Sequence, residues 1–78
     1  MTVQNLNTIL AENIKRYRKQ KGMTREKLAN EAGMSMSTLN YLEGGRRLPY
    51  GKSLVLLSLM LGVEVWQLFY PNDGGNKE

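Results

Sequence analysis

Apolar residues recur every three or four positions along most of the chain, which is the spacing of one face of an α-helix. No segment alternates apolar and polar residues in the manner of a half-buried strand. Glycines at positions 22, 33, 44 and 62 and a proline at 71 interrupt the pattern where helices are expected to end. The pattern predicts an all-α domain with a first helix that starts near Asn7 or Thr8, followed by helices at about 25–32, 36–43, 52–61 and 65–69.

The second and third predicted helices are separated by only a short turn. Leu28 and Ala32 give the earlier helix an apolar side, and Leu39 and Leu42 do the same for the later one. Gly33 ends the earlier helix and opens a turn of about three or four residues, which is typical of a helix-turn-helix unit. Such a unit presents its second helix to the major groove of DNA, so DNA binding becomes the first functional hypothesis.

The charge of the chain is concentrated in its middle. The chain has 78 residues, enough for one small domain, and a formal net charge of +4. Residues 15–52 include ten Lys or Arg and three acidic residues, a net charge of +7, and the remainder carries −3. A basic centre favours a polyanionic partner for one face, although the charge alone leaves an ordinary solvated surface equally open.

The composition also excludes several kinds of chemistry. The chain has no cysteine and no histidine, which excludes thiol and imidazole catalysis, disulfides and the usual zinc ligands. Its carboxylates are scattered, so we expect no enzymatic activity, no metal and no cofactor. The N-terminal residues do not form a secretory signal, and the longest apolar-rich run, at 54–61, is too short to span a bilayer. We therefore expect a cytoplasmic protein with no membrane partner.

Many positions agree in register with one known family. They are Ile14, Arg18, Gly22, Met23, Thr24, Leu28, Ala29, Gly33, Met34, Ser35, Leu39, Leu42, Glu43, Gly44, Gly45, Pro49, Leu54, Leu57, Leu61, Gly62, Val63 and Leu68. In these residues the chain resembles the phage repressor/Cro-like (XRE-type) helix-turn-helix family. The resemblance implies a compact five-helix repressor-like domain at 8–70, a short N-terminal arm at 1–7 and a flexible C-terminal tail at 71–78.

The resemblance also implies a function. Its members lead us to expect sequence-specific binding to double-stranded DNA by a homodimeric transcriptional regulator, a repressor of the phage/Cro or controller-protein type. A dimer of this kind binds a near-palindromic operator whose half-sites lie about 34–36 Å apart. The alternative is a protein-interaction module, such as an antitoxin, whose apolar C-terminal surface binds a protein partner.

The third predicted helix corresponds to the recognition helix of the family. The resemblance places four of its residues at base edges: Met36, Ser37, Asn40 and Tyr41. Asn40 has the groups for bidentate pairing with adenine, and Met36 can pack on a thymine methyl. The helix has no Arg, Lys or Gln on this face, which argues against strong guanine recognition and favours A·T-containing half-sites. The alternative is a polar, merely exposed helix face.

A second set of residues is expected at the DNA backbone. Thr24 and Ser35 precede helices whose free amides suit a phosphate. The resemblance adds Arg25, at a position where this family touches the backbone or an outer base, and the loop after the recognition helix. The expected backbone contacts are Thr24, Arg25, Ser35, Gly44, Arg46 and Arg47. The alternative for Arg46 and Arg47 is that they are solvated charges of the loop.

Two further groups of residues have structural roles in these predictions. The resemblance implies an ion pair between Arg18 and Glu43. The alternative is that they are two independent surface charges. The predicted helices at 52–61 and 65–69 are apolar nearly all round, which indicates cover by a partner. We expect a dimer surface at Leu56, Leu59, Met60, Val65 and Trp66, unless the last helix and the tail of the same chain cover it.

Overall fold

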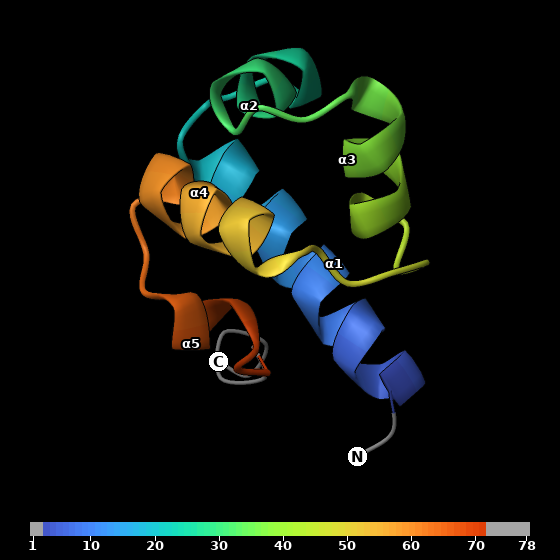
Figure 1. Ribbon diagram of the computed structural model, residues 1–78. Helices are drawn as coiled ribbons and strands as arrows, with labels where there is room; N and C mark the ends of the chain where they lie inside the picture. The colour runs from blue at the N-terminus through green and yellow to red at the C-terminus, as the bar shows by residue number, and fades with distance from the viewer. Residues whose placement is uncertain (1–2, 72–78) are drawn as a thin grey trace.

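The computed structural model describes residues 3–71 and consists of five helices around one core (Figure 1). The helices are α1 (Val3–Gln20), α2 (Arg25–Glu31), α3 (Met36–Glu43), α4 (Gly51–Leu61) and α5 (Val65–Leu68). No strand occurs among the described residues, so the predicted all-α, five-helix fold is confirmed. None of the helices in this part of the chain combines the length and apolarity needed to span a membrane.

The main difference from the prediction is the start of α1. This helix begins at Val3, not at Asn7 or Thr8, so residues 3–7 of the expected arm are helical. Leu6 continues the apolar side one turn before the buried Leu10, which extends the helix past the polar residues that resemble a cap. The other boundaries differ by one residue at most. Residues 72–78 of the expected tail lie outside the described residues.

The core is built from leucines contributed by every helix. Its fully buried large apolar side chains are Leu10, Ile14, Leu28, Leu39, Leu42, Leu57 and Leu68. Burying one such side chain stabilises the fold by about 1.5–3 kcal/mol relative to leaving it exposed. In Figure 1, α3 lies on one side of the domain and α5 on another, with α1 and α4 between them. The core therefore fixes α3 and α5 at a distance from each other.

The helix-turn-helix unit is bounded by residues that define its turns. Thr24 accepts a hydrogen bond at its side-chain oxygen from the amide of Lys27 (3.0 Å), which caps α2. Ser35 caps α3 in the same way, since its Oγ accepts from the amide of Thr38 (3.1 Å). Gly33 lies between the two helices with a φ of +69°, a conformation that favours glycine. These local contacts start α3 at a defined residue and direction.

A buried amide joins the two ends of the fold. Asn13 in α1 donates from Nδ2 to the carbonyl oxygens of Gln67 (3.3 Å), Leu68 (2.7 Å) and Tyr70 (2.9 Å). Its Oδ1 accepts from Nη2 of Arg16 at 2.7 Å. The carbonyls at the end of a helix have no partners within the helix, and Asn13 supplies one here. This contact anchors α5. The sequence predicts the helix but not its attachment to Asn13.

Candidate nucleic-acid interface

The helix α3 divides cleanly into an inner and an outer side. Leu39 and Leu42 are fully buried, and they attach the helix to the core. The residues expected at base edges are all exposed on the opposite side: Met36, Ser37, Asn40 and Tyr41. The structure therefore brings these four residues together on one solvent-facing surface, which we call the outward face of α3.

The orientation of α3 depends on a buried ion pair. Nε of Arg18 donates to Oε2 of Glu43 at 2.8 Å, and Nη2 donates to Oε1 at 3.3 Å. Nη1 of the same guanidinium donates to the carbonyl oxygen of Met23 (2.9 Å), just before α2. Both charged side chains are buried. The guanidinium of Arg18 in α1 therefore binds both the last residue of α3 and the backbone just before α2.

Arg25 of α2 lies beside the outward face of α3. Its Nη1 donates to Oδ1 of Asn40 at 3.2 Å, and its Nε lies 3.7 Å from Oε1 of Glu43. The side chain of Arg25 remains about half exposed, at 53%. The sequence analysis expects Arg25 at the DNA backbone or an outer base, but residue type alone does not predict its hydrogen bond to Asn40. The hydrogen bond joins Arg25 to a residue expected to read bases.

Two more guanidinium groups lie beside Tyr41. The Cζ atoms of Arg46 and Arg47 are 5.6 Å and 5.3 Å from the centre of the Tyr41 ring. At these distances a guanidinium is attracted to the electron-rich face of the ring. The loop arginines that were expected at the DNA backbone are therefore held next to the outward face of α3.

The basic side chains around the outward face differ in whether an acidic side chain pairs with them. Within residues 3–71, ion pairs occupy Arg18, Arg25 and Lys27. Lys27 pairs with Glu31 one turn away, and the hydrogen bond and charge of that carboxylate raise the pKa of Lys27. In contrast, no acidic side chain in the described part of the chain pairs with Arg46 or Arg47. These two guanidinium groups remain available for an anion.

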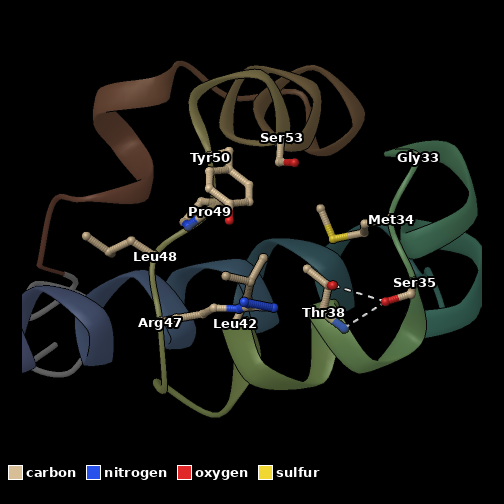
Figure 2. Close-up of a pocket in the computed structure, with 10 residues that line it drawn as sticks. All are labelled: Gly33, Met34, Ser35, Thr38, Leu42, Arg47, Leu48, Pro49, Tyr50 and Ser53. Atoms are coloured by element: carbon tan, nitrogen blue, oxygen red, sulfur yellow. Dashed lines mark hydrogen bonds between the residues drawn. The ribbon is translucent and has the colours of Figure 1, made fainter.

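Two of the hollows beside α3 are lined by residues of more than one helix. The larger, of about 360 Å³, lies between the α2–α3 turn, α3 and the loop before α4. Figure 2 shows Ser35 and Thr38 bonded on one wall, with Tyr50 and Pro49 opposite. The smaller, of about 230 Å³, is lined by Arg25, Asn40 and Lys15 of α1, among others. Lys15 is a candidate that the sequence analysis missed; only its position beside Arg25 reveals it.

The expected dimer surface is only partly exposed. Leu59 and Trp66 are 64% and 62% exposed, and Val65 is half-buried. Leu56 and Met60 are partly buried and pack against the core, so less of their surface is open to a partner than that of Leu59. The exposed apolar positions also include Val55 and Tyr70, and the rings of Trp66 and Tyr70 meet edge to face at 5.8 Å. The most exposed members of the expected dimer surface are thus Leu59 of α4 and Trp66 of α5.

Comparison with known proteins agrees with this geometry. The pattern of the family HTH_3, described as Helix-turn-helix, matches residues 14–65. A Sinorhizobium fredii protein described as the uncharacterized HTH-type transcriptional regulator y4dJ is 35% identical over 69 residues, covering 88% of this chain and 90% of the relative. The structure of the hypothetical transcription factor NHTF from Neisseria aligns with a TM-score of 0.84 and 27% identity, covering 99% of this chain and 88% of NHTF.

The N-terminal DNA binding domain of SinR from Bacillus subtilis aligns with a TM-score of 0.77 and 32% identity, covering 83% of this chain and 96% of that domain. A polar outward face on the second helix, bordered by guanidinium groups, defines the class: a helix-turn-helix DNA-binding domain. The chain belongs to the HTH_3 family of XRE-type helix-turn-helix transcriptional regulators. This family is a class of DNA-binding regulator domains and not of enzymes.

Proposed function

We propose that the chain acts as a homodimeric transcriptional repressor that binds a near-palindromic operator. The observation that carries this proposal is the exposed polar face of α3, fixed by the buried Arg18–Glu43 pair and bordered by Arg25, Arg46 and Arg47. The likeness to the DNA binding domain of SinR supports it at 32% identity. The comparisons favour this role over a protein-interaction module, and DNA as the target implies action in the cytoplasm.

In this proposal α3 enters the major groove and reads base edges. Asn40 accepts from N6 of adenine at Oδ1 and donates to N7 from Nδ2. Met36 packs against a thymine methyl group, and Ser37 and Tyr41 exchange hydrogen bonds with neighbouring bases. The exposure of all four side chains on one face supports this assignment.

Backbone contacts then set the register on the duplex. Arg46 and Arg47 neutralise phosphates on the Tyr41 side, and Lys15 does so beside Arg25. The amides at the starts of α2 and α3, next to Thr24 and Ser35, donate to phosphate oxygens, and the loop that begins at Gly44 lies against the same strand. The unpaired charges of Arg46 and Arg47 support this division of roles.

Dimerisation through the Leu59–Trp66 surface completes the proposal. A two-fold axis through an interface of this kind places the same residues of both subunits against each other. The surface lies on α4 and α5. Because α5 lies on another side of the domain than α3 (Figure 1), dimerisation through it would leave both recognition helices free. Two half-sites about 34–36 Å apart then match one helical turn of DNA. Occupying an operator in this way blocks access of polymerase, which is the basis for proposing repression.

The test is selection of bound sequences from a random duplex library, followed by affinity measurements over a range of salt concentrations. We expect a two-fold symmetric consensus and a linear fall of log affinity with log salt, because phosphate contacts release counterions. Absence of salt-sensitive binding to every duplex would rule out the proposed function.

A further inference from the structure

The outward face of α3 includes no cationic residue of its own. This is why the sequence favoured A·T-containing half-sites. The structure supplies a guanidinium to that face from another helix, because Nη1 of Arg25 donates to Oδ1 of Asn40 at 3.2 Å. Arg25 is the first residue of α2, so the surface that faces the bases is built from two helices.

The guanidinium of Arg25 is held from two directions. On one side, Oε1 of Glu43 lies 3.7 Å from Nε. That carboxylate is itself fixed by Arg18 and is 4% exposed, so it offers a rigid anion. On the other side, Nη1 is bonded to Asn40. Within residues 3–71 no protein acceptor binds Nη2, and the side chain is 53% exposed, so this nitrogen is available to a ligand.

We propose that Arg25 recognises a guanine next to the base pair contacted by Asn40; this inference rests on the proposed function. An arginine fork matches O6 and N7 of guanine with two parallel hydrogen bonds. Each terminal nitrogen has two hydrogens, so Nη1 retains one after binding Asn40, and Nη2 supplies the second. In this proposal the residue that recognises guanine therefore belongs to α2 and not to α3.

The contact between Arg25 and Asn40 links the two recognition events. A carbonyl oxygen has two lone pairs, so Oδ1 of Asn40 can accept from Arg25 and from N6 of adenine together. Because a guanidinium only donates, its presence also decides which way the Asn40 amide faces. The Nδ2 group is thereby turned away from Arg25 and is free to donate to N7. The pair recognises an adenine and a neighbouring guanine as one unit.

The test compares Arg25→Lys with the parent protein in selection from random duplexes. Lysine keeps the positive charge but loses the fork, so we expect it to retain salt-sensitive binding and lose most of the preference for guanine. A bidentate contact corresponds to roughly 5- to 150-fold discrimination, and that is the loss expected at one position. Arg46→Lys is the matched control, because a phosphate contact tolerates the exchange and should leave the preferences unchanged.

A second measurement changes the DNA in place of the protein. Replacing the guanine with 7-deazaguanine removes N7, which should weaken the parent protein several-fold and leave Arg25→Ala unaffected. If the parent protein selects a defined site but Arg25→Ala weakens all duplexes equally, Arg25 binds phosphate and the inference is wrong. If the parent protein selects no site at all, the proposed function fails as well.

Discussion

Nε of Arg18 donates to Oε2 of Glu43 at 2.8 Å inside the domain, across 25 positions of sequence. The two residues belong to α1 and α3, and few other polar side chains are as deeply buried. A buried ion pair contributes little net stability, since desolvation offsets much of its Coulomb energy. Its effect here is on orientation, because the guanidinium also binds the backbone before α2 through Met23.

Replacing Glu43 with leucine should therefore destabilise the fold strongly. The change leaves the guanidinium of Arg18 buried without its partner, which typically costs about 3–5 kcal/mol of unfolding free energy. Urea denaturation followed by circular dichroism measures this loss. The double variant Arg18→Met with Glu43→Leu is the control, and it should regain much of the stability. A double variant as unstable as the single one would show that the unpaired charge is not the cause.

The amide of Asn13 gives a second stability prediction. Asn13→Ala removes the donor to three carbonyl oxygens at the end of α5, so we expect a loss of about 1–3 kcal/mol. Asn13→Asp should cost at least as much at neutral pH, since a carboxylate cannot donate to carbonyls. Glu12→Ala, on the exposed side of the same helix, is the control and should change the denaturation midpoint little. Equal midpoints for Asn13→Ala and the control would contradict this role.

The local elements of this fold follow closely from the sequence. Glycine and proline mark the ends of the helices, and Thr24 and Ser35 mark two starts, so α2 and α3 are predicted to within a residue. The apolar spacing of Leu39 and Leu42 also determines which side of α3 faces inward. These features depend on neighbours along the chain, which is why they can be read without a structure.

The contacts that the sequence does not reveal join residues far apart in the chain. Asn13 resembles any polar residue of an amphipathic helix until α5 is placed beside it. Arg25 belongs to α2 and Asn40 to α3, so their hydrogen bond depends on the angle between these two helices. Leu56 and Met60 have the same apolar character as Leu59, and only the packing of α4 shows that Leu59 is the most exposed of the three. Long-range geometry, not residue type, decides these cases.

Substitutions at the proposed interface should separate base recognition from backbone contact. Asn40→Ala should weaken binding and relax the preference at one position by roughly 1–3 kcal/mol. Arg46→Ala should instead weaken binding to all duplexes about equally and lower the salt slope by about one. Affinities for a panel of single-base operator variants at several salt concentrations distinguish the two patterns. Loss of affinity with unchanged preference in both variants would contradict the assignment of α3.

The oligomeric state tests the apolar surface on α4 and α5. Changing Leu59 and Trp66 together to glutamate places two charges per subunit in the proposed interface, so we expect a monomer. Sedimentation equilibrium or light scattering measures the mass directly. Tyr50→Glu adds a charge at an exposed aromatic outside this surface and serves as the control, with an unchanged mass. A double variant with the same mass as the parent would place the dimer contact elsewhere.

The helix α5 has only four residues, too few to hold its shape without outside support. Its direction is set by the three carbonyls that Asn13 binds from α1, and it carries Trp66. In the proposed dimer, that direction determines how far apart the two recognition helices lie. One base pair of extra spacing turns a half-site by about 35° around the duplex. On this proposal, a change at the interior amide of Asn13 should alter the operator length that the dimer accepts and leave the bases read by α3 unchanged.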